Sequence, residues 1–246
     1  MKSNFFRILL LLFVLSLSGA AAARTYLVAV GVADYPGSDM DLTLPANDAA
    51  SVVEVYKAKQ ALTHVLLTNS EATADRITRA IKQVFAKANE DDIVVFFFSG
   101  HGYNGGFLAY DSRISYKQVR EAMAQSKCRN KMMFIDACHA GGVREEATTA
   151  HTNRVSSDMR GANVMIFLSS RDDEYSLESP SMSCGFFTTY LCRALQGSAD
   201  ENSDGVVTAR ELFKYVNGGV SDFSGNRQHP VMWGRFSNDM PVIKLK

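Results

Sequence analysis

Two uninterrupted apolar runs dominate the pattern of hydrophobic positions, one from Ile93 to Phe98 and one from Met132 to Ile135. Neither run alternates with polar residues, which is typical of a strand buried on both faces of a parallel sheet. Each run leads into a glycine-rich turn, the first with His101 and the second with Cys138. A helix predicted between them, over residues 115–125, makes a crossover with parallel strands. If the strands are neighbours, both side chains meet at the carboxyl edge, where open α/β sheets place their sites.

The remaining pattern alternates shorter strands with helices. The clearest helix carries Ile77, Ile81 and Phe85 at four-residue spacing, which predicts one buried face. This alternation predicts an α/β fold, a three-layer sandwich with a mostly parallel central sheet. We find no internal repeat and no second domain, and we expect the end of the chain, residues 228–246, to be irregular or partly extended. The other predicted strands are 25–31, 64–67 and 163–169 with a short segment at 107–110, and the other predicted helices are 47–59, 73–88, 186–195 and 209–216.

The first 23 residues have the composition of a secretory signal peptide. Lys2 and Arg7 precede the apolar stretch 8–15, and small residues follow up to Ala23. The apolar stretch is too short to span a membrane comfortably, so we expect no membrane anchor after its removal. The prediction is a secreted or periplasmic protein with one domain over residues 24–246. Without the leader, 24 Lys and Arg face 26 Asp and Glu, and no basic surplus points to nucleic acid.

Four cysteines are too few for a disulfide scaffold, although an exported chain could form disulfides. If Cys138 stays a free thiol, three others remain. Cys184 and Cys192 either pair with each other or are buried thiols, and burial is the simpler interpretation. The disulfide state of these two residues and of Cys128 stays open.

Cys138 and His101 have the chemistry of a thiol nucleophile and its base. A cysteine nucleophile needs a base within hydrogen-bond reach, and imidazole titrates near neutral pH. His139 is a competing partner, but adjacent residues of an extended segment point to opposite faces, so it should point away from the thiol. The alternative is an ordinary buried thiol and a polar histidine. Two such residues closing two apolar strands in glycine-rich turns favour catalysis.

The segments Ser99–Gly102 and Asp136–Gly141 resemble the paired motifs of the caspase and metacaspase family of cysteine peptidases. The likeness extends to residues 31–35, 47–49 and 169–178. It implies a caspase-like sandwich, a His101–Cys138 dyad, and an oxyanion hole formed by the backbone N–H groups of Gly102 and Cys138. It also implies a protein or peptide substrate and no required cofactor. Preorganised donors of this kind stabilise the charge that develops on a tetrahedral intermediate.

Three polar residues could form a pocket for the residue before the cut. Asp136 lies two positions before Cys138 and shares its face of the strand, and Ser99 has the same relation to His101. Asp48 opens the helix after the first strand, where its simplest role is a helix cap. The resemblance to metacaspases implies that Asp48, Ser99 and Asp136 shape a pocket for a basic side chain. We therefore predict a cysteine endopeptidase that cuts after Arg or Lys.

Residues 200–211 match an EF-hand calcium loop at every ligand position. The loop is single, whereas EF-hands usually occur in pairs, so it is either a calcium site or a turn. The acidic calcium site of many metacaspases follows the histidine strand, where this sequence has Tyr116 and Lys117. Calcium is therefore a possible ligand rather than an expected activator. The candidate ligands are Asp200, Asn202, Asp204, Val206 through its carbonyl, and Glu211.

A long polar stretch, residues 141–161, directly follows the candidate nucleophile and holds Arg144, Arg154 and Arg160. Exposed polar loops are the usual sites of nicking, so we predict self-processing within residues 143–161, after Arg154 or Arg160. The alternative is an uncut loop that covers the site. The rival interpretation of the whole chain is a non-catalytic caspase-like module that binds a protein or calcium. The presence of both His101 and Cys138 argues against it.

Overall fold

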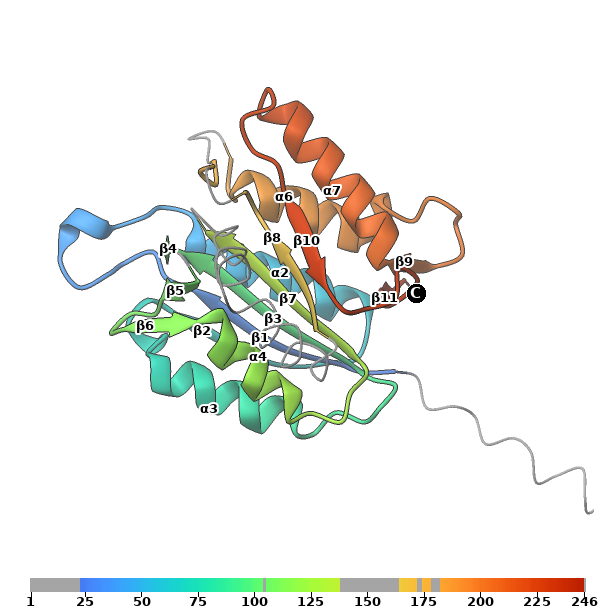
Figure 1. Cartoon of the computed structure of the whole chain (residues 1–246), viewed down its shortest axis with the longest axis horizontal. Coiled ribbons are helices and arrows are strands. Elements are labelled where there is room, and N and C mark those ends of the chain that lie inside the picture. The colour runs from blue at the N-terminus through green and yellow to red at the C-terminus, as the bar shows by residue number, and fades with distance from the viewer. Residues whose placement is uncertain (1–22, 104, 138–163, 172–173, 178–181, 246) are drawn as a thin grey trace, which may run out of the picture.

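The computed structural model describes residues 23–103, 105–137, 164–171, 174–177 and 182–245. Its centre is a six-stranded sheet in the order β10-β8-β7-β3-β1-β2 (Figure 1). Five neighbouring strands are parallel, and β10 runs antiparallel beside β8. The predicted α/β fold with a mostly parallel sheet is therefore confirmed. The strands are β1 (Thr25–Gly31), β2 (Leu62–Thr68), β3 (Ile93–Gly100), β7 (Asn130–Ala137), β8 (Val164–Leu168) and β10 (Val231–Gly234).

Helices cover both faces of the sheet and complete three layers. Alternate residues of each central strand face opposite sides, so Val28 and Phe96 join one apolar core while Leu27 and Phe97 join the other. The first core is closed by α3 (Ala74–Phe85) and α4 (Tyr116–Ala124). The second is closed by α2 (Pro45–Lys59), α6 (Phe186–Arg193) and α7 (Ala209–Phe223).

Smaller elements surround this frame. β4 (Gly102–Tyr103), β5 (Gly106–Leu108) and β6 (Arg113–Ser115) form a small antiparallel sheet beyond the end of β3. β9 (Val206–Thr208) pairs with β11 (Pro241–Lys244). Single turns of 3-10 helix span Ser38–Met40 and Asn69–Glu71, and a π-helical turn, Ala194–Ser198, extends α6.

The crossover expected between the two apolar runs is present. β3, α4 and β7 follow one another, and β3 and β7 pair in parallel with Gly100 opposite Ala137 and Ser99 opposite Asp136. Parallel strands end at the same edge, so the residues that follow both strands in sequence start from adjacent points. Among the helices that the structure describes, none is long and apolar enough to cross a membrane. Of the expected leader, residues 1–23, the first 22 lie outside the described residues.

The last segment, expected to be irregular or partly extended, contains the strands β10 and β11, so the extended alternative is confirmed. Two predicted helix boundaries were wrong. α2 begins at Pro45 rather than Asn47, because proline fits the first helical position, where its missing N–H is not needed. α7 was expected to end at Val216, before two glycines that disfavour helix, yet it continues to Phe223.

The second of those glycines has a packing role. A Cβ atom on Gly219 would lie 2.3 Å from the Tyr190 ring, so the absence of a side chain lets α7 pack closely on α6. A Cβ atom on Gly218 would meet nothing within 4 Å. The extra helical turns are therefore held by packing against α6, which outweighs local propensity.

We predict that Gly219→Ala destabilises the fold by about 1–3 kcal/mol, because the tyrosine ring must move to admit the methyl group. Gly218→Ala is the matched control and should stabilise the fold by about 0.5–1 kcal/mol, as helix propensity dictates. Urea unfolding of both variants measures the difference. Equal effects of the two substitutions would contradict the proposed role of Gly219.

Candidate active site

His101 follows the last residue of β3 and is fixed on three sides. Its backbone N–H donates to the Tyr35 hydroxyl at 3.0 Å, and the two rings lie 4.9 Å apart. The same hydroxyl donates to the carbonyl of Leu108 at 3.2 Å. Burial raises the pKa of Tyr35 to about 12, so this hydroxyl stays a donor at physiological pH. Gly100 permits the approach, because a Cβ atom there would lie 2.7 Å from the tyrosine oxygen.

The ring of His101 has one nitrogen already engaged. Nε2 lies 2.8 Å from the backbone carbonyl of Met40, in the 3-10 turn Ser38–Met40. A carbonyl oxygen only accepts hydrogen bonds, so Nε2 carries the proton in the neutral ring. Nδ1 is then the unprotonated nitrogen and the one that can serve as a base. We assign this tautomer from the hydrogen bond. The carbonyl of Met40 could not be predicted as a partner of His101, because a backbone group leaves no signal in the sequence.

The expected nucleophile, Cys138, lies outside the described residues and directly follows Ala137 in the chain. Ala137 is the last residue of β7 and pairs with Gly100, which precedes His101. Its backbone N–H and carbonyl are both bonded to the Ser169 hydroxyl at 3.2 Å. The expected oxyanion donor Gly102 begins β4 immediately after His101 and is partly exposed. The paired strand ends therefore start from adjacent points on one edge.

A pocket of about 270 Å³ opens beside His101. Asp136 and Ser99, both predicted to shape a specificity pocket, belong to its lining. Asp48 lies behind Ser99, whose hydroxyl donates to the aspartate oxygen Oδ2 at 2.7 Å. The structure thus brings the three predicted residues together. The lining residues are Leu42, Pro45, Ser99, Gly100, His101, Asp136, Ala137, Ser176 and Leu177.

Asp48 is not a helix cap. It lies inside the first turn of α2, and the preceding Leu44 caps the helix without a side-chain bond. The Asp48 side chain is 1% exposed and its Oδ1 accepts from the backbone N–H of Gly185 at 3.0 Å. The capping interpretation was wrong because the helix starts earlier, at Pro45, and this turns the carboxylate toward the carboxyl edge of the sheet.

Asp136 is held by a different set of donors. Its Oδ2 accepts from the backbone N–H of Thr188 at 3.2 Å and from the Thr188 hydroxyl at 2.7 Å. Its Oδ1 accepts a short bond from the Ser176 hydroxyl. Gly185 and Thr188 belong to the N-terminus of α6, where free N–H groups and the helix dipole favour negative charge. Sequence reasoning missed Ser176, Gly185 and Thr188, because none carries a charge or a recognisable motif.

Burial dominates the electrostatics of this acidic pair. It raises the pKa of Asp48 to about 8, with the nearby Asp136 as a second cause, and it raises the pKa of Asp136 as well. Two buried carboxyls this close titrate as a unit, and the pair retains a proton more readily than two exposed aspartates would. A cation entering the pocket would favour the fully ionised form.

The three described cysteines, Cys128, Cys184 and Cys192, are free thiols. Cys184 lies just before the N-cap of α6 and Cys192 lies in its last turn, and the helix rises by about 9 Å from its first residue, Phe186, to Cys192. A disulfide requires Cα atoms within about 7 Å, so this pair stays unbridged. Cys184 lies within 3.3 Å of the Ser51 hydroxyl, and burial raises the pKa of its thiol to about 11.

The candidate calcium loop is closed by its own hydrogen bonds. Asp200 accepts from the backbone N–H groups of Asp204 and Gly205, and Asn202 and Asp204 bond within the loop. The Glu211 carboxylate turns to Thr208 and to the N–H of Glu201. Within the described ranges, no three His, Cys, Asp or Glu side chains gather closely enough to hold a metal ion. Calcium binding by the loop, including the carbonyl of Val206, stays a prediction.

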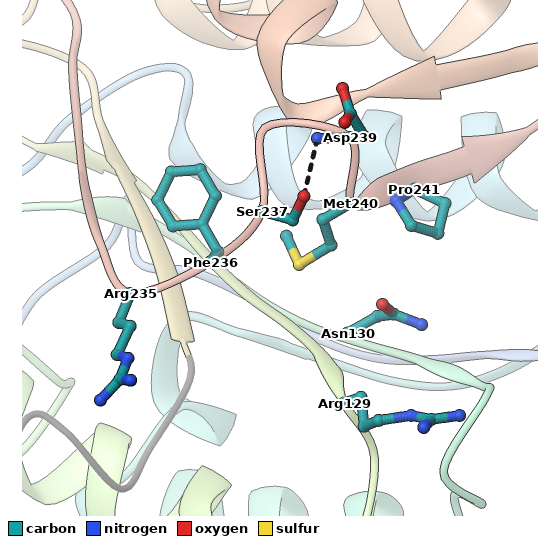
Figure 2. Close-up of a pocket in the computed structure, with 8 residues that line it drawn as sticks. All are labelled: Arg129, Asn130, Arg235, Phe236, Ser237, Asp239, Met240 and Pro241. Atoms are coloured by element: carbon teal, nitrogen blue, oxygen red, sulfur yellow. Dashed lines mark hydrogen bonds between the residues drawn. The ribbon is translucent and has the colours of Figure 1, made fainter.

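A second cavity, of about 520 Å³, lies near the amino-terminal end of β7 (Figure 2). Its charged lining residues include Arg129, which pairs with Asp91, and Asp239, which pairs with Arg210. Asn130 is the first residue of β7, so this cavity is at the opposite edge of the sheet from His101. The acidic pocket, by contrast, lies beside the candidate base.

The caspase domain family matches residues 24–240, so this chain belongs to that family. No curated protein matches the sequence. Among solved structures, the chain is similar to protein GSU0716 from Geobacter sulfurreducens, with a TM-score of 0.65, 13% identity, and coverage of 91% of this chain and 100% of that one. It is also similar to caspase-1 from Spodoptera frugiperda, with a TM-score of 0.63, 17% identity, and coverage of 88% of each chain. At these identities the two structures support the fold alone. Family membership identifies a caspase-like peptidase domain and implies protein substrates.

The raised pKa of Asp48 predicts how stability varies with pH. The pKa of this carboxyl is about 8 in the folded state and about 4 in the unfolded state. Its contribution to stability is therefore fully present below about pH 4 and is lost as the pH rises toward about 8. Wild-type stability should therefore fall over this range, by at most about 1.4 kcal/mol per pH unit for one proton. Asp48→Asn keeps an acceptor for the N–H of Gly185, lets its amide donate to the Ser99 oxygen, and should flatten the slope.

Urea unfolding at pH 5, 6, 7 and 8 measures this slope for both proteins. Asp75→Asn is the control, because Asp75 is an exposed partner of Arg79 and its loss should leave the pH dependence unchanged. Parallel curves for wild type and Asp48→Asn would contradict the assignment of a buried proton to this pair.

Proposed function

We propose that this protein is a cysteine endopeptidase that cleaves peptide bonds after Arg or Lys with a Cys138–His101 dyad. The observation that carries the proposal is the pocket beside His101, with Asp136 in its wall and Asp48 behind Ser99. Both carboxyl groups are buried, and no arginine or lysine is among the described residues that line the pocket. An arginine or lysine side chain of a substrate would supply the missing cation.

In the proposed reaction, the Cys138 sulfur attacks the scissile carbonyl carbon. His101 takes up the thiol proton at Nδ1, while Nε2–H stays bonded to the Met40 carbonyl, which stabilises the resulting imidazolium. The backbone N–H groups of Gly102 and Cys138 stabilise the oxyanion. The imidazolium then protonates the leaving amine, and water hydrolyses the acyl-enzyme, which regenerates the thiol.

Substrate binding should change the protonation of the pocket. The acidic pair tends to retain a proton in the free protein, because burial disfavours the second negative charge. A guanidinium or ammonium group in the pocket favours the fully charged pair, so binding of a basic side chain would release that proton. A neutral or acidic side chain would not pair with the ionised carboxyl groups and would gain no binding free energy from them. This difference is the physical basis of the preference for Arg and Lys.

We further propose that the enzyme is exported through the leader of residues 1–23 and acts in a secreted or periplasmic setting on protein or peptide substrates. It needs no cofactor, since the thiol and imidazole suffice for the chemistry. The alternative is a non-catalytic module that binds a protein or calcium. A direct assay of peptide cleavage separates the two.

The first test is cleavage of a peptide library varied at the residue before the cut. Wild type should cleave after Arg and Lys, both in EDTA and in calcium, and Cys138→Ala should be inactive. Cys128→Ala is the matched control, because that thiol is buried away from the site, bonds to the carbonyl of Asp92, and should be dispensable. Asp136→Asn should lower kcat/KM for Arg peptides by about 30-fold or more, as losing one partner of a buried charge pair costs at least about 2 kcal/mol.

Three results would contradict this proposal. Activity that persists in Cys138→Ala would remove the nucleophile from its role. Equal cleavage after Arg and after Asp by the wild type would refute the acidic pocket. A wild type that cleaves no member of the library while binding one of them would favour the non-catalytic module.

Self-processing within residues 143–161 is the second test. These residues lie outside the described part of the chain, and the prediction rests on Arg144, Arg154 and Arg160 following Cys138 in sequence. Incubation of wild type should produce new amino termini at Val155 or Gly161, detected by mass spectrometry, and Cys138→Ala should remain intact. The fragments should stay associated, because β7 and β8, on either side of the loop, pair within one sheet. An uncut wild type that cleaves peptides would show that processing is not required.

A further inference from the structure

Gln228 is a fully buried polar residue that the proposed chemistry does not use. It lies after the end of α7, its side chain is 0% exposed, and its backbone N–H donates to the Ser224 hydroxyl at 3.1 Å. A buried amide requires hydrogen-bond partners, because each unsatisfied group loses its interaction with water. The side-chain amide of Gln228 finds its partners in Ser169, Ser176 and Leu177, of which the last two line the acidic pocket.

The Gln228 amide holds the pocket wall from behind. Its Oε1 accepts from the backbone N–H of Leu177 at 2.8 Å, and its Nε2 lies 3.4 Å from the Ser176 hydroxyl. Ser176 and Leu177 both line the pocket. The Ser176 hydroxyl in turn donates to Asp136 Oδ1. Because an amide N–H can only donate, it occupies a lone pair of the serine oxygen and leaves the hydroxyl hydrogen for the aspartate.

The same amide also bonds to the end of β8, the strand next to β7. Nε2 donates to the backbone carbonyl of Ser169 at 2.9 Å, directly after β8. The Ser169 hydroxyl is bonded to the N–H and carbonyl of Ala137, the residue before Cys138. The Gln228 side chain therefore links the pocket wall to the end of β8 and, through Ser169, to the end of β7, which precedes Cys138 in sequence.

The residue after Gln228 secures the same wall segment. The backbone N–H of His229 donates to Glu174 Oε2 at 2.7 Å, and its Nδ1 lies 2.6 Å from Glu174 Oε1. Residues 174–177 are thus anchored by two consecutive residues of a segment that is about 50 positions away in sequence. Because side-chain hydrogen bonds supply most of the anchoring of residues 174–177, the position of this short wall depends on those bonds.

We propose that Gln228 is a positioning residue for substrate specificity, which sets the wall of the acidic pocket and the orientation of the Ser176 hydroxyl on Asp136. The proposal rests on the proposed preference for Arg and Lys and deepens it. Gln228 touches neither the substrate nor the reacting atoms. Its loss should therefore weaken the binding of a basic side chain and leave the thiol chemistry nearly intact.

The test variant is Gln228→Met, which keeps the length of the side chain and removes its hydrogen bonds. The matched control is Gln60→Met. Gln60 is also buried, bonds to the Thr25 hydroxyl and accepts from the Lys244 N–H, and lies beside the first residue of β1 at the opposite edge of the sheet. Both variants should lose stability, whereas only the first should alter the pocket.

For an Arg peptide, KM should rise about tenfold in Gln228→Met, which corresponds to about 1.4 kcal/mol, while kcat changes less than about threefold. In a second assay, alkylation of Cys138 by iodoacetamide should proceed at the wild-type rate, whereas alkylation by an arginyl chloromethyl ketone should slow about tenfold. Gln60→Met should match wild type in both assays. Ser176→Ala should raise KM as well, and the double variant should be less impaired than the product of the single effects, because both act through one contact.

These outcomes separate failure of this inference from failure of the proposed function. A wild type that reacts equally with arginyl and aspartyl chloromethyl ketones would overturn the basic pocket itself. A wild type that prefers the arginyl reagent, with Gln228→Met preserving that preference, would overturn the role of Gln228 alone. If Gln228→Met does not fold, Gln228→Asn keeps the amide but withdraws it by one methylene. A wild-type KM in that variant would equally refute the proposal.

Discussion

Two buried carboxyl groups at the N-terminus of α6 are the constraint on which the site depends. Asp48 comes from α2 and Asp136 from β7, and they meet the helix at the backbone N–H groups of Gly185 and Thr188. Charges that are this deeply buried are costly unless donors surround them. The end of α6 supplies such donors and so lowers the free-energy cost of burying the two carboxyl groups. The same helix closes one of the two apolar cores. Fold and site share this one helix.

The sheet, and the edge of it that carries His101, could be predicted because their sequence signals are local. The run before His101 is apolar without alternation, and the run before Cys138 has the same form, which is enough to expect neighbouring buried strands. Ser99 and Asp136 could be placed on the same strand faces as His101 and Cys138 from spacing, since residues two apart share a face. Their common pocket was implied by the resemblance to metacaspases.

The parts that escaped prediction depend on contacts between distant segments. Gln228 reads as an ordinary polar residue after a helix, and only the packing of its surroundings makes it a buried anchor for residues 176 and 177. Asp48 was predicted in the pocket, but a helix cap was a competing role because the helix start at Pro45, without a capping side chain, was not predicted. The helix beyond Val216 continues through two glycines because α6 packs on it. In each case tertiary packing outweighs the local signal.

The hydrogen bond between His101 Nε2 and the Met40 carbonyl has a consequence for mutational studies of this protein. The atom that orients the imidazole belongs to the main chain, so exchanging the Met40 side chain leaves it in place. If the proposed dyad is correct, an alanine scan would detect Cys138 and His101 and would miss the backbone carbonyl of Met40. Insertions, deletions or proline within the turn Ser38–Met40 would move the carbonyl and expose its contribution. Backbone geometry in an exposed turn can thus be as strictly required as a side chain, while every substitution that preserves that geometry is tolerated.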